Sequence, residues 1–204
     1  MFTGFVMLIL GVNNPMLLIL PLWIFVALFQ KKLSTLIRSF SLPIAFIGSG
    51  VAFGLLIEVF AILDNLQKPV AERILLSPDP LTDLFFGLFY YSFVVVTWYL
   101  LIRKISFSKA DVFLLTGALG IATEQAGNIF WGIFAGPLGV ITAAVVASIY
   151  GVFPYLAYLL TEDRFDFSCT PRKIWHYPLA IFALFIQWAL FGLFVLPFLK
   201  SFSF

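Results

Sequence analysis

Long stretches of apolar residues alternate along the chain with short polar segments. Within each stretch the apolar residues run continuously, a pattern that favours helices over strands. A helix needs about 20 residues to cross the ~30 Å hydrocarbon core of a bilayer. The sequence therefore predicts six membrane-spanning helices, over residues 8–29, 40–63, 83–102, 112–134, 138–160 and 178–199.

The first of these spans is the least regular. Asn13, Asn14 and Pro15 interrupt its beginning. Residues 1–12 are therefore expected either to lie in the membrane interface or to form a bent first turn. No Lys or Arg precedes the apolar run, which argues against a signal peptide.

The composition of the chain supports the same fold class. Hydrophobic residues make up 62% of the chain and charged residues 11%, and the mean hydropathy is +1.08. Soluble domains contain about 45–50% apolar and about 25% charged residues. Because the backbone must satisfy its own hydrogen bonds inside a bilayer, we expect an all-α, polytopic membrane helix bundle. Residues 1–204 are expected to form one integral membrane domain.

The basic residues predict an orientation. Nine of the twelve follow predicted spans one, three and five: Lys31, Lys32, Arg38, Arg103, Lys104, Lys109, Arg164, Arg172 and Lys173. Only Lys68, Arg73 and Lys200 lie on the other side. Since cytoplasmic loops carry an excess of Lys and Arg, both termini are predicted on the outer side. The expected location is a cell membrane of the prokaryotic type.

The loops carry local signals. The outer loop 64–82 is predicted to contain a short interfacial helix over 69–76. Asp79 and Pro80 are predicted as the N-cap and first residue of the third span. His176, the only histidine, lies among aromatic residues and is interpreted as part of an interface belt.

The chain carries few residues that could bind a cofactor. One cysteine and one histidine exclude an internal disulfide and a cysteine- or histidine-rich metal site. No cofactor and no metal are therefore expected. A net charge of +2 does not indicate a nucleic-acid partner.

Glycines recur at four-residue spacing in two predicted spans. Gly50 and Gly54, and Gly132 and Gly136, form GxxxG pairs, which allow two helix backbones to approach closely. The fifth span has a similar small face, formed by Ala143, Ala147 and Gly151. Tight helix packing is one interpretation, and a slot for a flat isoprenoid chain is the other.

The same spacing connects these glycines with acidic residues. Span two reads Gly50-x3-Gly54-x3-Glu58, and span four reads Gly120-x3-Glu124-x3-Asn128-x3-Gly132-x3-Gly136. Each series lies on one helical face. The similarity is too short to indicate a duplication.

Several polar residues are predicted at similar depth in the outer half of the membrane. With a helical rise of 1.5 Å per residue, Glu58 lies roughly 8 Å deep and Glu124 roughly 15 Å deep. The other members of this group are Tyr90, Tyr91, Gln125, Asn128 and Gln187. We expect them to converge on one cavity that opens to the outer side. Interhelical hydrogen bonding by Gln125, Asn128 and Gln187 is the alternative.

The two glutamates are the strongest functional candidates. A charged acid at mid-membrane costs about 2.5–3.5 kcal/mol on insertion scales, and such residues usually mark a site or pathway. No Lys, Arg or His lies within a predicted span to pair with Glu58 or Glu124. Each is therefore either neutral and hydrogen-bonded or ionised in a water-filled pocket.

Three functions remain open. In the first, the protein binds or acts on an isoprenoid- or lipid-like molecule, with Glu58 and Glu124 as acid catalysts that protonate an alkene or epoxide. Aromatic walls would stabilise the resulting cation, and the candidates are Tyr90, Tyr91, Trp98 and Trp131. The absence of HExxH, GxSxG and paired-aspartate motifs disfavours metalloproteases, serine hydrolases and prenyltransferases.

The second function is a transporter coupled to protons or cations, for which two buried acids without basic partners are suited. Six spans are few for a transporter, although a homodimer would enlarge it. The third is an accessory subunit of a larger membrane complex, with the 26 phenylalanines facing lipid or partner helices. The expected partners are thus membrane lipids, a hydrophobic small molecule, further copies of the chain or other membrane subunits.

Overall fold

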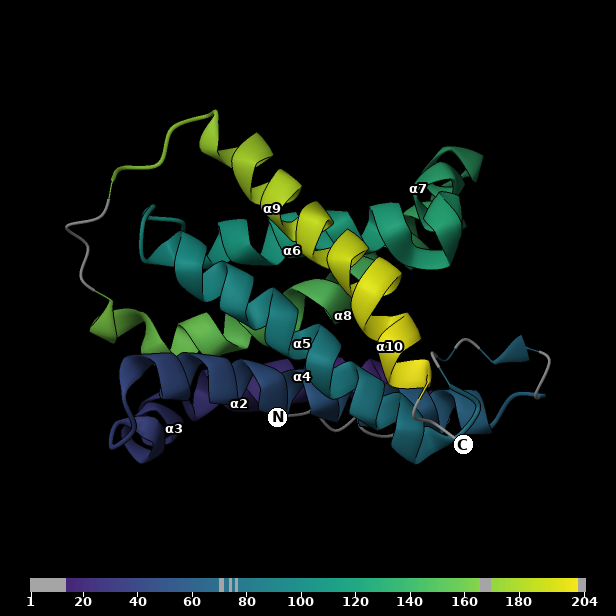
Figure 1. Ribbon diagram of the computed structural model, residues 1–204, viewed down its shortest axis with the longest axis horizontal. Helices are drawn as coiled ribbons and strands as arrows, with labels where there is room; N and C mark the ends of the chain where they lie inside the picture. The colour runs from purple at the N-terminus through teal and green to yellow at the C-terminus, as the bar shows by residue number, and fades with distance from the viewer. Residues whose placement is uncertain (1–13, 70–71, 74, 76, 166–169, 202–204) are drawn as a thin grey trace.

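A computed structural model describes residues 14–69, 72–73, 75, 77–165 and 170–201 of the chain, which are almost entirely helical (Figure 1). The helices are α2 (Ile19–Leu28), α3 (Gln30–Ile37), α4 (Leu42–Leu66), α5 (Pro80–Ile102), α6 (Lys109–Thr123), α7 (Asn128–Gly132), α8 (Pro137–Thr161), α9 (His176–Leu190) and α10 (Leu196–Lys200). Short 3-10 segments cover η1 (Pro15–Leu18), η3 (Glu124–Gly127), η4 (Ile133–Ala135) and η5 (Glu162–Arg164), and a π-helical segment, η6 (Phe191–Val195), joins α9 to α10.

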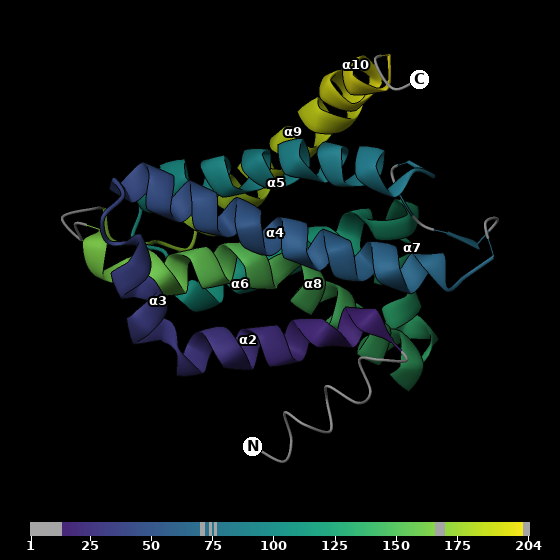
Figure 2. The same cartoon turned by 90° about the horizontal axis from the view of Figure 1, so that it is seen from below.

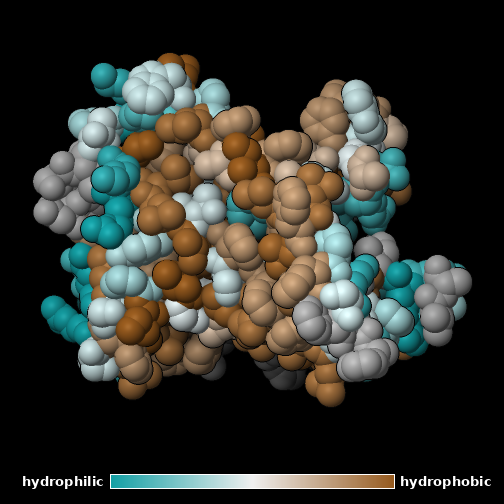
Figure 3. Space-filling model, in the orientation of Figure 1, coloured by the Kyte–Doolittle hydropathy of each residue, from teal (hydrophilic) through white to brown (hydrophobic). Residues whose placement is uncertain are grey.

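Within the described residues, four helices are long and apolar enough to cross a membrane. They are Leu42–Leu66, Pro80–Ile102, Pro137–Arg164 and His176–Lys200, and they coincide with the predicted spans 40–63, 83–102, 138–160 and 178–199. A fifth results if the pair Pro15–Leu28 and Gln30–Ile37, bent by 77°, is one span. Apolar side chains cover the middle of the face shown in Figure 3, with hydrophilic groups toward its two ends. The chain is an all-helical, multi-pass integral membrane protein.

The first predicted span ends in a sharp bend, and the fourth does not form a single helix. In the first, the described chain starts with η1 and α2, and it bends at Phe29 into the polar helix α3. The expectation for residues 1–12 lies outside the described residues. In the fourth, α6 stops at Thr123, so the prediction of one helix over 112–134 is wrong.

The backbone explains why the fourth span is interrupted. Gln125, Ala126 and Gly127 have φ values of 49°, 55° and 86°, which place three successive residues in the left-handed region. A right-handed helix cannot continue through them. The chain then forms the short helix α7 and turns at Gly136, whose φ is 131°. Gly136 leads directly into Pro137, the first residue of α8.

Helix α8 lies at the centre of the bundle. It packs against α4 and α6 along most of its length, and α4 also packs against α5. Figure 2 shows α9 and α10 on one side of this group and α2 on the other. The largest fully buried side chains belong to this core and include Trp98, Tyr158, Phe46, Phe86, Phe107 and Phe153.

Gly50 and Gly54 of α4 lie at close helix contacts, as the GxxxG spacing predicts. A Cβ atom at Gly50 would lie 2.7 Å from Val95 Cγ2, and one at Gly54 would overlap the ring of Tyr91. The small face of α8 behaves similarly, since a Cβ atom at Gly151 would lie 2.6 Å from the carbonyl oxygen of Phe113 on α6.

The corresponding prediction for Gly132 and Gly136 is wrong. A Cβ atom at either residue would meet nothing within 4 Å. The 3-10 segment η4 and the turn at Gly136 separate the two glycines, so they do not share a helical face. Four-residue spacing implies a common face only where the helix is continuous.

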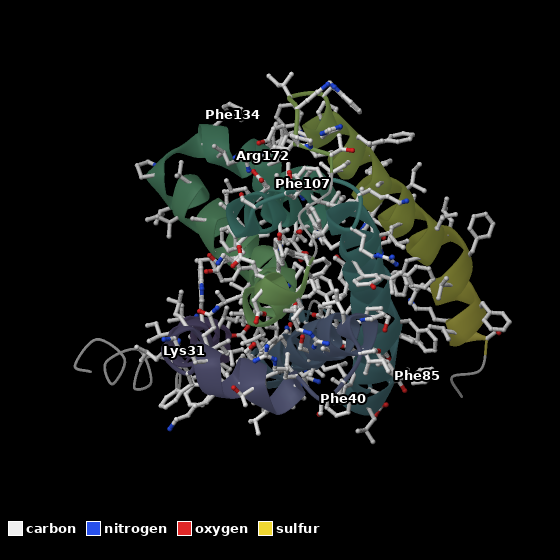
Figure 4. The ribbon with its side chains drawn as sticks, turned by 90° about the vertical axis from the view of Figure 1, so that its left-hand side faces the viewer. Lys31, Phe40, Phe85, Phe107, Phe134 and Arg172 are labelled. Carbon is white, nitrogen blue, oxygen red and sulfur yellow. The ribbon has the colours of Figure 1, made fainter. Side chains whose placement is uncertain are left out.

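The ends of the helices that carry most basic residues gather at one end of the bundle, on the left in Figure 1. Figure 4 looks onto this end and labels Lys31 and Arg172. Ser108 and Asp111 form a capping box at the start of α6, and Arg172 pairs with Asp111. Lys109 Nζ lies 2.5 Å from Glu162 Oε2.

The predicted cap of the third span is confirmed. The backbone N–H of Thr82 donates a 2.7 Å hydrogen bond to Asp79 Oδ2, and Pro80 is the first residue of α5. The predicted helix over 69–76 lies partly outside the described residues.

His176 does not face a membrane interface. It is buried at the start of α9, and its Nδ1 accepts a 2.9 Å hydrogen bond from the backbone N–H of Lys173. The side chain of His176 is therefore not part of a surface belt as the sequence suggested, while Trp175 beside it is exposed. This hydrogen bond closes the turn between Lys173 and His176 that leads into α9.

Candidate functional site

A cavity of about 540 Å³ lies between α4, α5, η3, α8 and the α9–α10 helix. Its polar lining is Glu58, Asp64, Asn65, Lys68, Tyr90, Tyr91, Thr123, Glu124, Gln125, Thr142 and Tyr150. Its apolar lining is Met16, Ile57, Ala61, Leu75, Ile129, Val146, Ile149, Phe153, Trp188, Phe191, Gly192 and Leu196. Ligand sites in proteins typically have volumes of about 300–1,000 Å³ and combine apolar walls with a few polar groups.

Glu58 is held by a phenol from the neighbouring helix. The hydroxyl of Tyr91 on α5 donates a 2.5 Å hydrogen bond to Glu58 Oε2 on α4. The ring of Tyr91 lies directly over Gly54, one turn before Glu58, where any larger residue would exclude it. The glycine therefore makes the hydrogen bond sterically feasible.

Glu124 is held in the same way by a different pair of helices. The hydroxyl of Tyr150 on α8 donates a hydrogen bond to Glu124 Oε2, directly after the end of α6. The ring of Tyr150 lies over Gly120, again one turn before the glutamate. The two Gly-x3-Glu series noted in the sequence thus form two equivalent contacts, each a glutamate bonded to a tyrosine that packs on the glycine.

The backbone around Glu124 is strained. Gln125 and Ala126 are non-glycine residues in the left-handed region, which costs about 1–3 kcal/mol each. Such strain persists only where the surroundings impose it, and it clusters at functional sites. Glu124 and Gln125 of this segment both line the cavity.

Aromatic rings form much of the wall between the two glutamates. The ring of Tyr90 lies edge-on to those of Tyr91, Tyr150 and Phe191, at centroid distances of 5.4, 6.5 and 5.5 Å. Phe153 packs edge-on against Tyr91 at 4.9 Å. The negative faces of such rings can stabilise a cation that lies over them.

The basic residue at the cavity is already paired. Lys68, which follows α4, is the only Lys, Arg or His among the described residues that line the cavity, and its Nζ lies 2.6 Å from Asp64 Oδ2. Among the described residues, Lys68 therefore forms its ion pair with Asp64 and not with Glu58 or Glu124. The hydrogen-bond donors of Glu58 and Glu124 are phenols and not cations.

The structure brings together most of the residues selected from the sequence. Glu58, Glu124, Gln125, Tyr90 and Tyr91 all line this one cavity. We expected these residues to meet at one cavity because they lie at similar positions along their helices, and they do line the same cavity.

Four candidates lie elsewhere. Asn128 is exposed at the start of α7, and Trp131 is 68% exposed and contacts Phe130 and Phe134. Trp98 is buried in the core, where its Nε1 donates to Thr116 Oγ1. Gln187 is buried, and its side-chain nitrogen and oxygen have no hydrogen-bond partner among the described residues.

The displacement of Asn128 and Trp131 follows from the break in the fourth span. If the helix had continued past Thr123, Asn128 would have lain one turn beyond Glu124 on the same face. The left-handed segment redirects the chain, so the residues of α7 point away from the direction that the helical spacing predicts.

Sequence reasoning missed Tyr150. Its hydroxyl is one of several in the fifth span, and its one distinguishing signal was its position directly before Gly151 of the small face. Nothing in the spacing along α8 links it to Glu124, because the contact joins residues 26 positions apart.

No group of three or more His, Cys, Asp or Glu side chains that could hold a metal ion occurs among the described residues. Comparison with protein-family models, with curated proteins and with solved structures finds no match to this chain.

Proposed function

We propose that this protein binds an isoprenoid- or lipid-like molecule in the cavity and presents the polar or reactive part of that molecule to Glu58 and Glu124. The observation that carries the proposal is that two acidic side chains from different helices, each bonded by a tyrosine, line one cavity with largely apolar and aromatic walls. A purely structural acid needs a partner on another helix but does not need a shared cavity.

The chemistry of this arrangement suits acid catalysis on an apolar substrate. A protonated carboxyl group in such a site can donate a proton to an alkene or epoxide. The rings of Tyr90 and Phe191 would face the positive charge that develops on the substrate. Positioned acid catalysis of this kind typically contributes about 10²–10⁴-fold in rate.

The proposed orientation places the cavity in the outer half of the membrane. The nine basic residues that follow predicted spans one, three and five would be cytoplasmic, with about six crossings and both termini outside. Asp64 and Lys68 at the far end of α4 would then form the outer rim of the cavity. A cytoplasm-active reporter fused after Phe204 is expected to be inactive, and robust activity would reverse the orientation.

The binding proposal is tested by what co-purifies with the protein in a mild detergent. Lipid extracts of purified wild type are compared by mass spectrometry with extracts of Glu58→Gln and Glu124→Gln. The matched control is Asp163→Asn, an exposed acid at the opposite end of α8.

We expect one apolar species to be enriched in the wild type and in Asp163→Asn. Its amount or its chemical form should change in both glutamine variants, while their melting temperatures stay close to that of the wild type. Identical lipid profiles in all four proteins would contradict the proposal.

One observation favours a second function, transport coupled to a cation or proton. The interruption of the fourth span at Glu124–Gly127 places unwound backbone beside a half-buried acid that lines the cavity, as in transporters with discontinuous helices. If this function is correct, purified protein in liposomes should move Na⁺ or protons down an imposed gradient, and Glu124→Gln should abolish the flux. Absence of flux in wild-type liposomes would exclude it.

A further inference from the structure

A second buried carboxyl group lies behind Glu58 and outside the lining of the cavity. Asp83, the fourth residue of α5, is 0% exposed. Its Oδ1 accepts a 3.0 Å hydrogen bond from the backbone N–H of Ser77. An acid in the first turn of a helix is stabilised by the helix dipole. These two facts account for the position of Asp83 but for only one of its oxygens.

The other oxygen has no donor in the described protein. Oδ2 of Asp83 is buried and has no hydrogen-bond partner among the described residues. An unsatisfied buried acceptor costs about 1–3 kcal/mol, so native structures rarely keep one without a reason. Asp83 lies one turn before Gly87, on the face of α5 that packs against Glu58, and the two carboxyl groups interact electrostatically.

The surface of α5 is shaped to hold Glu58 in this position. Asp83, Gly87 and Tyr91 follow one another at four-residue intervals and so share one helical face. A Cβ atom at Gly87 would lie only 3.3 Å from Glu58 Cγ, which shows how closely the glutamate packs there. Glu58 therefore lies between the carboxyl group of Asp83 and the phenol of Tyr91.

Two neighbouring carboxyl groups in a site without a cationic partner are not both ionised, because their like charges repel. One proton between them supplies the donor that Asp83 Oδ2 otherwise lacks, since a protonated acid has an O–H to donate. We infer that Glu58 and Asp83 form a proton-binding pair that holds one proton, and that this pair exchanges protons between the outer end of α5 and the cavity.

The other groups around the pair do not supply a competing positive charge. From α4, Asp64 faces the cavity in an ion pair with Lys68. From α5 the facing group is Tyr90, from η3 it is Glu124, and from α8 it is Tyr150, which is bonded to Glu124. The lining residues of the α9–α10 helix are not titratable.

The positions of Asp83 and Glu58 define a direction for proton transfer, from the loop before α5 to the cavity. Asp83 contacts the loop at Ser77, and Glu58 lies on the cavity wall. A proton taken up at Asp83 is transferred to Glu58 as Asp83 loses it, and Glu58 then donates it into the cavity. This use of the proton rests on the proposed function, whereas the existence of the pair rests only on the buried residues themselves.

Infrared spectroscopy of the purified full-length protein can detect the shared proton. The carbonyl stretching band of protonated carboxylic acids is measured as a function of pH in the Glu124→Gln background, which removes the contribution of Glu124. To this background are added Glu58→Gln, Asp83→Asn, or the exposed control Asp163→Asn.

We expect the parent protein and the control to keep this band at neutral pH. Glu58→Gln and Asp83→Asn should both lose it there, because each replaces one acid by an amide that can donate to the remaining carboxylate. Persistence of the band in Asp83→Asn would show that Glu58 is protonated without Asp83 and would overturn the pair. Absence of the band from the parent protein would also overturn it.

Two further measurements keep the interpretation specific. Circular dichroism and gel filtration confirm that each variant is folded, and the titration is repeated with Na⁺ replaced by a large organic cation. A band that Na⁺ removes at constant pH would assign the site to a metal cation and not to a proton. If the apolar species co-purifies but the infrared band is absent, only the Glu58–Asp83 pair is contradicted. If the band is present but no apolar species co-purifies, only the proposed function is contradicted.

Discussion

The helix pair α4–α5 and the helix pair α6–α8 contain the same contact with different surroundings. In both, a glycine lies one turn before a glutamate, and a tyrosine from the facing helix packs on the glycine and bonds the glutamate. After Glu58, α4 continues for two more turns to Leu66, whereas α6 ends immediately before Glu124. The two pairs lie side by side in the bundle through the contact of α4 with α8 (Figure 2).

The difference between the two helix pairs shows that a Gly-x3-Glu pattern can predict a contact between helices without predicting whether the helix continues after the glutamate. Glu58 is enclosed by two side chains of α5 on a rigid helix. Glu124 is attached to a strained segment whose next residue, Gln125, is exposed. We therefore expect Glu58 to be the proton-holding acid of the cavity and Glu124 to be the acid that moves or hydrates more readily.

The largest expected change in stability tests whether Gly54 and Gly120 have equivalent packing roles. Gly54→Leu and Gly120→Leu should each destabilise the protein by about 3 kcal/mol, at the upper end for overpacked sites, because a Cβ atom alone would overlap Tyr91 or Tyr150. Gly48→Leu on α4 and Gly132→Leu on α7 are the matched controls, since neither would meet a neighbour within 4 Å. Thermal unfolding in detergent measures the effect, and a control as unstable as the test variants would refute the packing assignment.

The next effect separates the two hydrogen bonds. Tyr91→Phe should cost about 1–3 kcal/mol, because it leaves Glu58 buried beside Asp83 without its donor. Tyr150→Phe should cost less, since Glu124 lies next to an exposed segment and can be hydrated.

Tyr155→Phe on α8, whose ring packs on Trp23 and Phe113, controls for the loss of a hydroxyl. The three unfolding curves are recorded under one condition. Equal losses for Tyr91→Phe and Tyr150→Phe would remove the asymmetry between the two glutamates.

A smaller effect of opposite sign tests the strained segment. Ala126→Gly should stabilise the protein by about 1 kcal/mol, because glycine adopts the left-handed conformation without a steric penalty. Ala122→Gly, four residues earlier inside α6, should instead destabilise it by roughly 0.5–1 kcal/mol. If both changes shift the melting temperature in the same direction, the left-handed segment is not the conformation of the protein in solution.

The smallest expected effect concerns the start of α6. Burial acts to raise the pKa of Asp111, but hydrogen bonds from Ser108 and the pairing with Arg172 outweigh it and lower the pKa below the ordinary value of 3.8. A lowered native pKa means that this contribution to stability is complete above pH 3.8 and is lost as the pH falls through the native value.

Asp111→Asn should therefore lower the melting temperature at neutral pH. The melting temperature of this variant should also fall less steeply than that of the wild type as the pH is lowered. Solvent around Arg172, which is 43% exposed, keeps the contribution of that ion pair below about 1 kcal/mol. A variant that declines in acid as steeply as the wild type would show that Asp111 does not contribute to the pH dependence.

Much of the fold was predictable because it depends on local properties of the chain. The continuous apolar runs identified the four long spanning helices, since their ends coincide with the loss of hydrophobicity. The start of α5 was predictable from Asp79 and Pro80, whose capping roles involve only their immediate neighbours. The grouping of Glu58, Glu124, Tyr90 and Tyr91 followed from depth alone, because antiparallel helices bring residues of equal depth to the same level.

Other features required the tertiary structure. Helical spacing assigned Asn128 to the face of Glu124, but three left-handed residues between them broke that relation, and no proline marked the interruption.

The sequence by itself determined the four long apolar helices, the cap of α5 and the close contacts at Gly50 and Gly54, because each of these depends on hydrophobicity and spacing along a single helix. Only the tertiary structure decided that Tyr150 bonds Glu124, that Asp83 lies beside Glu58 and that a side chain at Gly132 would point into open space. These contacts depend on how two helices are rotated toward each other, and that rotation results from the packing of the whole bundle and not from the spacing within either helix.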